Sequence, residues 1–286
     1  MKHVLIAGAG SYIGAQFERH LAGFPGAYRV STLDVKGDAW READFSGVDA
    51  VVLVAGIAHQ KETAANAPLY YRVNRDLAVD VARKAQAEGV KQLVFLSTIA
   101  VYGLTRGTIG PDAKPQPRSH YGKSKLAAEA LLTSLAGDGF RVAVLRPPMV
   151  YGPHCRGNYP RLAALAQRLP LFPACGNRRS ALYVGHLTEA IRLIVDSGEG
   201  GLFLPQDGEY VDTGEMMRLV ARAHGRDLKL IPGLRALTRL LGRLPGAFGK
   251  VFGDLTIDRA LSERPEGYRR LTLKQAIEET ERGAIP

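Results

Sequence analysis

The chain has 286 residues, of which 46% are hydrophobic and 23% are charged, a composition typical of a folded protein and not of a disordered one. This length accommodates one large domain, or a nucleotide-binding domain with a smaller substrate lobe. The net charge is +10, but the Lys and Arg residues are scattered without interleaved aromatic residues, which favours phosphate-bearing small molecules over nucleic acid as ligands.

Targeting segments and metal sites are not indicated. No run approaches the roughly eighteen continuous apolar residues of a membrane-spanning helix, and the first apolar run meets Gly8 too soon for a signal peptide. We therefore expect a cytoplasmic protein without an integral membrane segment. The two cysteines, Cys155 and Cys175, lack metal-ligand spacing, so we expect free thiols and no metal.

Short apolar runs alternate with helical patterns along the first half of the chain. Runs made almost entirely of Val, Ile and Leu are typical of strands that are buried on both faces. Strand-like runs occur at 3–7, 29–33, 50–54, 93–96 and 142–145, with helix-like stretches at 13–22, 71–88 and 121–135. This alternation predicts an α/β fold with a Rossmann-type, doubly wound parallel sheet, in which the crossover over residues 34–49 is abbreviated.

The pattern changes after Pro153. The helical stretches that follow lie at 159–168, 186–196 and 213–224 and are joined by loops containing Pro and Gly. We expect residues 1–152 to form the nucleotide-binding Rossmann domain and residues 153–286 to form mainly a smaller, mixed α/β substrate lobe. A segment at about 181–195 is expected to return to the first domain.

One stretch of this second half, residues 234–244, combines an apolar stripe at helical spacing with a basic opposite face. Such a helix could lie on an anionic membrane. We favour a helix packed on its own lobe or on a partner subunit, and Gly242, Pro245 and Gly246 limit its length. The sequence does not settle the role of residues 234–250.

A glycine-rich turn follows the first strand directly and opens a helix, which is the context in which such a motif binds a dinucleotide. Gly8 allows the tight turn, and Gly14 lets the helix pack close to the strand. The backbone N–H groups of Ser11, Tyr12 and Ile13 would face a pyrophosphate at the positive end of the helix.

Two further positions fit a dinucleotide. Asp34 stands just past the second strand, where a carboxylate accepts hydrogen bonds from both ribose hydroxyls and repels a 2′-phosphate. This favours NAD over NADP, although Lys36 and Arg29 are close by in sequence. Ala55 and Gly56 follow the third strand and leave room for a dinucleotide, or simply for tight packing.

Tyr121 and Lys125 lie four residues apart in an expected helix, downstream of the strand that ends at Ser97 and Thr98. This spacing places the phenol and the ammonium on one helix face. A nearby cation would lower the pKa of the phenol from its usual value near 10, so the pair is a candidate acid/base device. The alternative is an ordinary solvated helix face.

Taken in order, these motifs resemble those of the extended short-chain dehydrogenase/reductases, and within them the NAD-dependent sugar-nucleotide epimerase/dehydratase group. The resemblance rests on Gly8–Gly14, Asp34, Ser97–Thr98, Val101–Tyr102–Gly103, Tyr121 with Lys125, and Arg146–Pro147. It implies that Thr98, three residues before Val-Tyr-Gly, hydrogen-bonds the C4 oxygen of the sugar. Tyr121 would be the catalytic base, and Lys125 would contact the nicotinamide ribose and polarise the phenol.

The resemblance also implies NAD as cofactor, a UDP-sugar as substrate and a homodimer. It places Asn74 and Pro147 at the cofactor, and Arg179, Asn158 and Met149 at the substrate, with Arg179 on the diphosphate. Two positions depart from the family pattern. Ser11 replaces the middle glycine of the first turn, and Met149 stands where an asparagine is common.

The reaction class follows from one more departure. Thr98 is followed by Ile99–Ala100, whereas dehydratases of this family carry Asp-Glu there, so a 4,6-dehydratase is disfavoured. Our leading hypothesis is an NAD-dependent 4-epimerase of a UDP-hexose or UDP-N-acetylhexosamine, by family analogy in surface polysaccharide synthesis. The alternatives are a reductase of a UDP-4-keto-6-deoxy sugar and a non-catalytic dinucleotide sensor.

Overall fold

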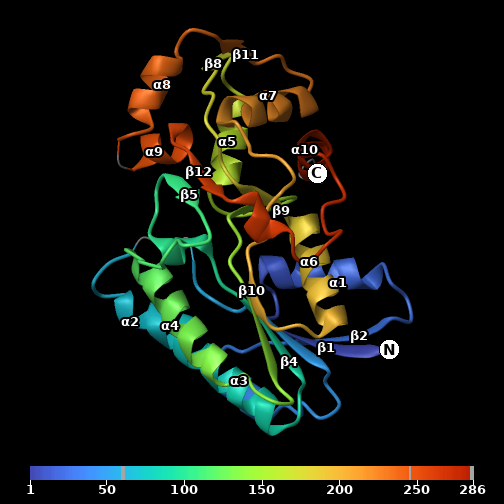
Figure 1. Ribbon diagram of the computed structural model, residues 1–286. Helices are drawn as coiled ribbons and strands as arrows, with labels where there is room; N and C mark the ends of the chain where they lie inside the picture. Colours follow the sequence, from blue (N-terminus) through green and yellow to red (C-terminus); the bar gives the residue numbers. More distant parts are fainter. Residues whose placement is uncertain (59–61, 245, 284–286) are drawn as a thin grey trace.

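The computed structural model describes residues 1–58, 62–244 and 246–283 (Figure 1). At its centre is a six-stranded sheet with the order β10-β6-β4-β3-β1-β2, in which every neighbouring pair is parallel. The strands are β1 (Lys2–Ala7), β2 (Tyr28–Leu33), β3 (Ala50–Leu53), β4 (Gln92–Leu96), β6 (Arg141–Leu145) and β10 (Gly201–Phe203). The predicted α/β fold with a Rossmann-type parallel sheet is confirmed.

Helices cover both faces of this sheet (Figure 1). Val4 and Ile6 of β1 pack with Phe17 on one face, whereas Leu5, between them, packs with Val81 on the other. Because successive residues of a strand point to opposite faces, strands covered on both sides are apolar throughout. The first face carries α1 (Tyr12–Ala22) and α6 (Val184–Ser197), and the second carries α3 (Leu77–Ala87) and α4 (His120–Ser134).

The crossover from β2 to β3 is abbreviated, as predicted. It contains only a short 3-10 turn, Ala39–Glu42, and the buried side chains of Trp40 and Phe45 pack in the cluster that covers this part of the sheet. The chain moves from β1 outward to β2 and then returns to the other side of β1 at β3. This reversal creates a crevice at the carboxyl ends of the strands, where sheets of this kind bind ligands.

The second part of the chain forms a smaller lobe, which lies above the central sheet in Figure 1. Tyr151, Met217 and Ile277 belong to its core. Its helices include α5 (Asn158–Ala166), α7 (Thr213–Ala223) and α10 (Leu273–Arg282). Three two-stranded parallel sheets join β7 (Met149–Tyr151) to β9 (Ala181–Tyr183), β8 (Leu171–Pro173) to β11 (Lys229–Ile231) and β5 (Gly107–Ile109) to β12 (Leu255–Ile257).

Short elements complete the described chain. They are α2 (Ala67–Tyr71), the π-helical turn η2 (Arg72–Asp76), the 3-10 turns η3 (Ile99–Tyr102) and η4 (Arg259–Ser262), α8 (Arg235–Leu241) and α9 (Ala247–Phe252). None of the helices in the described ranges is both long and apolar enough to cross a bilayer. Cys155 and Cys175 are buried free thiols, as expected.

The segment at about 181–195 comprises β9 and most of α6. Helix α6 packs on the central sheet and β10 completes its edge, but β9 pairs with β7 outside that sheet. The division of the chain at residue 152 stays a prediction.

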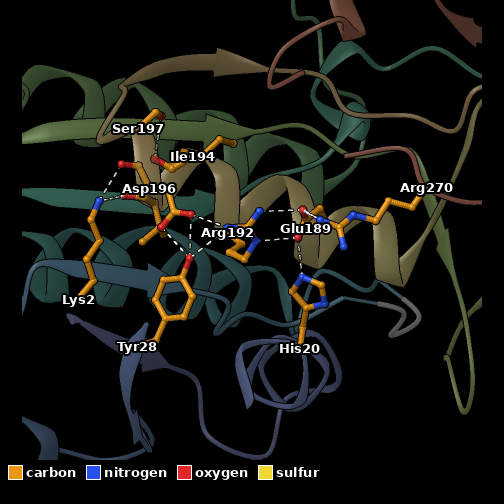
Figure 2. A network of polar contacts seen from close by, with 10 residues as sticks. Lys2, His20, Tyr28, Glu189, Arg192, Ile194, Asp196, Ser197 and Arg270 are labelled. Carbon is orange, nitrogen blue, oxygen red and sulfur yellow. Dashed lines mark hydrogen bonds and ion pairs between the residues drawn. The ribbon is translucent and has the colours of Figure 1, made fainter. Parts of the chain in front are cut away.

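A buried carboxylate of α6 forms hydrogen bonds and ion pairs with α1 and with residue Arg270 (Figure 2). Glu189, only 1% exposed, accepts hydrogen bonds from His20 Nε2 of α1 at 2.7 Å and from Arg192 Nε at 2.8 Å, and also pairs with Arg270. Arg192 in turn donates to the Tyr28 hydroxyl of β2. Burial alone would raise the pKa of Glu189, but the bonds from Arg192 and His20 outweigh it and lower this pKa to about 2.

The basic amphipathic stretch contacts its own lobe through only part of its helix α8. Leu241 is partly buried, whereas Leu237 is 50% and Leu240 is 58% exposed. Thr238 of this helix is buried, and its hydroxyl donates to the carbonyl of Cys175 at 3.3 Å. The reason is that Thr238 and Leu240 point to different sides of the helix, and the lobe contacts the side with the threonine. Pro245 lies outside the described residues.

Candidate active site

The turn after β1 depends on glycine. Gly8 has φ 127° and Gly10 has φ 73°, and a Cβ on Gly8 would lie 2.7 Å from the backbone nitrogen of Ala55. Ser11, which replaces the usual middle glycine, caps α1 by accepting a hydrogen bond from Gly14 N at 3.1 Å. The substitution therefore keeps the turn, and the positive end of α1 faces the crevice between the strand ends.

Asp34 lies beside this turn. The backbone nitrogens of Gly8 and Ala9 both donate to the carbonyl of Leu33, the last residue of β2, at 2.9 and 3.0 Å. The exposed Asp34 carboxylate comes next and accepts a hydrogen bond from Lys36 N at 3.0 Å. This places a fixed, accessible acceptor next to the glycine turn, as a ribose of a bound dinucleotide requires.

The side chain of Tyr12 points away from the expected cofactor, although its backbone N–H is expected to bind the pyrophosphate. Its hydroxyl is buried, has no hydrogen-bond partner among the described residues, and has a raised pKa because of burial. A Cβ on Gly152 would lie 2.8 Å from this hydroxyl. The side chains of Tyr12 and Ile13 thus pack toward the second lobe, which leaves their backbone N–H groups to serve a cofactor.

The segment after β3 approaches α4 very closely. A Cβ on Gly56 would lie 3.0 Å from Asn74 Oδ1 and 3.2 Å from Lys125 Nζ. Lys125 is only 4% exposed, and its ammonium donates to the carbonyl of Leu96 at the end of β4, at 2.8 Å. Ala55 and Gly56 therefore leave this space free for backbone and for the buried cation.

Asn74 ties three parts of the site together from the π-helical turn. It is fully buried, accepts from Ile57 N at 2.9 Å, and donates to Ile57 O and to Ser124 Oγ, both at 3.1 Å. Ser124 Oγ then donates to the carbonyl of Tyr121 at 2.9 Å. The sequence singled out Asn74 but missed Ser124, whose only signal is its place directly before Lys125.

The structure brings Thr98, and not Ser97, to the phenol of Tyr121. Thr98 Oγ1 caps the turn after β4, where it accepts from Ala100 N at 3.1 Å, and its hydroxyl lies close enough to the Tyr121 phenol to lower the pKa of that phenol. Ser97 is buried and donates to Glu129 behind the site. The choice of Thr98 over Ser97 therefore agrees with the direction in which the two hydroxyls point.

The expected lowering of the Tyr121 pKa by Lys125 is wrong. Burial raises the pKa of the Tyr121 phenol, and the bond to Thr98 offsets this only in part. Lys125 does not lower that pKa because its ammonium is directed at the Leu96 carbonyl, and burial lowers the pKa of Lys125 itself to about 8. The four-residue spacing predicted that both residues lie on one helix face, but it did not predict the direction of the Lys125 side chain.

Glu62, which no motif of the sequence indicates, stabilises the start of α4. Its carboxylate accepts hydrogen bonds from His120 N at 2.8 Å and Tyr121 N at 3.0 Å, while Ser119 Oγ accepts from Gly122 N at 3.0 Å. An acidic group at a helix N-terminus is stabilised by the helix dipole. Because Glu62 is distant in sequence, no local pattern indicates this contact.

Hydrogen bonds from the motifs Val101–Tyr102–Gly103 and Arg146–Pro147 fix the loop that carries Thr98. Buried Arg146 contacts both oxygens of Glu129 through Nε at 3.1 Å and donates to the Tyr102 hydroxyl at 2.8 Å. Pro147 accepts from Ile99 N at 3.1 Å. In the structure these motifs therefore position the loop between β4 and α4.

The expected substrate residues other than Thr98 lie in the second lobe. Met149 begins β7 and packs on the core of this lobe, and the exposed Asn158 opens α5. Arg179 is partly buried, which lowers its pKa, and its Nη1 donates to the carbonyl of Gly253 at 2.7 Å. Gly253 also lines a cavity of about 770 Å³ between β5 and α8.

A doubly wound parallel sheet, with a glycine turn at its switch point and a Thr-Tyr-Lys set at the strand ends, defines a dinucleotide-binding α/β protein. The model of the NAD dependent epimerase/dehydratase family matches residues 4–203, and the chain belongs to this family. The predicted family, and NAD as the cofactor that its members use, are thereby confirmed.

Individual relatives agree with this placement. The chain is 29% identical over 286 residues to a UDP-glucose 4-epimerase of Vibrio cholerae, covering 94% of this chain and 87% of that protein. It is 30% identical over 230 residues to the N-acetyl-alpha-D-glucosaminyl-diphospho-ditrans,octacis-undecaprenol 4-epimerase of Escherichia coli O157:H7, covering 78% and 68%. The structure of RMD from Pseudomonas aeruginosa complexed with NADPH superimposes over the full length of both chains with a TM-score of 0.80 at 18% identity, a likeness of fold.

Proposed function

We propose that this protein epimerises C4 of a nucleotide sugar, a UDP-hexose or a UDP-N-acetylhexosamine, by way of a 4-keto sugar. The observation that carries this proposal is the contact of the Tyr121 phenol with Thr98, next to buried Lys125 and close to the glycine turn. The relative in Vibrio cholerae, which is named a UDP-glucose 4-epimerase and matches nearly the whole chain, supports the same reaction.

The proposed roles follow from the positions of the side chains. Bound NAD would supply the hydride acceptor for oxidation at C4 and the hydride donor for the return step. Asp34 would hold the adenosine ribose, and the N–H groups at the start of α1 would hold the pyrophosphate. Thr98 would orient the C4 oxygen, and Tyr121 would exchange the proton of that oxygen. Lys125, one helical turn from Tyr121, would contact the nicotinamide ribose.

The residues after Thr98 support epimerase chemistry over dehydration. Ile99 and Ala100 occupy η3 where a dehydratase needs carboxylates to remove water from the sugar. The rival that shares every proposed residue is a reductase of a UDP-4-keto-6-deoxy sugar. The raised pKa of Tyr121 favours a protonated phenol, which suits proton donation to a keto sugar, so this rival is kept as a second candidate.

The test is to incubate the purified protein with UDP-glucose and UDP-N-acetylglucosamine without added cofactor, and to analyse the denatured protein for released nucleotide. We expect released NAD and a C4 epimer. An empty protein that oxidises NAD(P)H only with a 4-keto sugar would establish the reductase instead, and bound NAD without any turnover would establish a dinucleotide sensor.

Tyr121→Phe separates the role of the hydroxyl from that of the fold. We expect this variant to retain NAD and to lose turnover by about 100-fold or more, because the proton acceptor is gone. Full activity of the variant would contradict the assignment of Tyr121. The homodimer that the family resemblance implies is checked by light scattering on the same preparations.

A further inference from the structure

The outer end of the second lobe carries a surface that the proposed function leaves unused. Figure 1 shows α8 and α9 there, beyond the central core of the lobe. We call this surface the α8–α9 patch. It consists of the exposed apolar residues Leu237, Leu240, Leu244 and Phe248 and the exposed cations Arg239, Arg243 and Lys250.

Two leucines of helix α8 are exposed, which departs from the usual pattern. A surface helix normally directs its leucines inward and its polar residues outward. Here Thr238 is 1% exposed and Gly242 is buried, whereas Leu237 and Leu240 are half exposed or more. Contiguous exposed apolar side chains of this kind mark a surface that contacts another body.

The apolar surface continues onto α9. Phe248 is 52% exposed and stacks on Phe252 with ring centroids 6.5 Å apart, and Phe252 stacks on Phe172 of β8 at 6.0 Å. This series of three stacked rings runs from β8 to the surface of the lobe. Phe248 is therefore exposed to solvent on one side and packs against Phe252 on the other.

The positive charge of the same segment indicates an anionic partner. Residues 228–253 contain five Lys or Arg residues and no Asp or Glu. Two copies of this segment placed face to face would repel each other, which argues against a second copy of the chain as the partner. An anionic lipid surface complements both the cations and the leucines.

We propose that the α8–α9 patch binds the surface of an anionic phospholipid bilayer. Leu237, Leu240, Leu244 and Phe248 would enter the boundary between headgroups and acyl chains, while the cations would contact lipid phosphates. Helix α8 spans only Arg235–Leu241, so the contact is peripheral. This inference rests on the patch itself and holds for either reaction proposed above.

Two cations of the patch are linked through one cavity to Gly253, which bonds to Arg179, the residue proposed to hold the diphosphate. Arg239 and Arg243 line the cavity of about 770 Å³ together with Gly253, and Gly253 O accepts the hydrogen bond from Arg179. Docking through α8 and α9 would bring this end of the site to the membrane surface. A sugar diphosphate held at that surface would then be within reach of the enzyme.

Vesicle sedimentation tests the proposal without any turnover. The full-length protein is mixed with vesicles of phosphatidylcholine alone or of equal parts phosphatidylcholine and phosphatidylglycerol. We expect it to sediment with the second kind. Leu237→Ser with Leu240→Ser should lower the apparent partition coefficient at least about tenfold. Arg239→Gln and Arg243→Gln should each lower it about fivefold and weaken the preference for phosphatidylglycerol.

A matched control uses leucines of similar exposure elsewhere. Leu165 and Leu202 are each 46% exposed, and their replacement by serine should leave sedimentation unchanged. The proposal is overturned if the unaltered protein stays in the supernatant with both vesicles, or if the Leu237/Leu240 variant sediments equally well. A smaller oligomer of that variant by light scattering would show that the patch contacts a second copy, which also overturns it.

Discussion

Lys125 is the residue whose replacement tests the physical account of the site most sharply. Lys125 is only 4% exposed, and its ammonium donates a hydrogen bond to the carbonyl of Leu96 at 2.8 Å. We predict that Lys125→Met abolishes turnover and at the same time makes the folded protein more stable. Methionine fills a similar volume and carries no charge into the buried position.

The magnitude follows from the lowered pKa. Burial lowers the pKa of Lys125 to about 8, although Glu129 acts in the opposite direction. From an ordinary value near 10.4, at about 1.4 kcal/mol per pKa unit, the buried charge costs folding about 3 kcal/mol at neutral pH. The lost bond to Leu96 O offsets about 1 kcal/mol of the gain. The variant should thus gain about 2 kcal/mol in free energy of unfolding.

The stability difference between Lys125→Met and the unaltered protein should depend on pH. The unfolded chain keeps its proton on Lys125 up to about pH 10.4, whereas the folded chain releases it near pH 8, so the unfolded state binds more protons in this interval. The destabilising charge is fully present below pH 8 and disappears as the pH rises. The advantage of Lys125→Met over the unaltered protein should therefore shrink between about pH 8 and pH 10.

Urea unfolding of both proteins across this range measures the difference directly, and other alkaline effects cancel in the comparison. Lys123→Met is the matched control, because Lys123 is exposed on the same helix two residues earlier. The reasoning is refuted if Lys125→Met is no more stable than the unaltered protein at pH 7, or if its advantage does not change with pH.

Three further predictions concern other parts of the site and fold. Asp34→Ser should weaken NAD binding about 30-fold by calorimetry, because two charge-assisted ribose bonds are lost; unchanged affinity would place the ribose elsewhere. Glu62→Gln should lower kcat about tenfold with little change in KM, since the carboxylate positions Tyr121 through the helix start, and an unchanged kcat would reject this role. Glu189→Gln should cost about 3 kcal/mol in urea unfolding at pH 7. That loss should diminish as the pH falls from about 4.5 toward 2, where the carboxylate of the unaltered protein takes up its proton; a loss that is independent of pH would contradict it.

The sequence predicted the sheet and its glycine turn well because their signals are local. Apolar runs at residues 3–7 and 50–54 reflect strands covered on both faces, and Gly8 is required by a positive φ and a close backbone contact. Asp34 follows a strand that pairs with β1, so its place beside the turn follows from the parallel register.

The contacts that depend on side-chain direction could not be predicted. Glu62 reaches Tyr121 N across 59 residues of sequence, and neither residue type nor spacing indicates it. The ammonium of Lys125 turns to the end of β4, which a helix-spacing argument does not reveal. Likewise, the stripe of 234–244 predicted an amphipathic helix correctly, but which side of it faces the lobe depends on Thr238 and its neighbours.

The fate of the hydrogen on C4 tests the proposed reaction most directly. The purified protein is incubated with UDP-glucose deuterated at C4, and the sugar products are analysed by mass spectrometry and NMR. If the hydride is taken from C4 and returned within one cycle, both epimers retain the deuterium at C4. An epimer that has exchanged its deuterium for solvent hydrogen, or no epimer from either UDP-glucose or UDP-N-acetylglucosamine, would contradict the proposal.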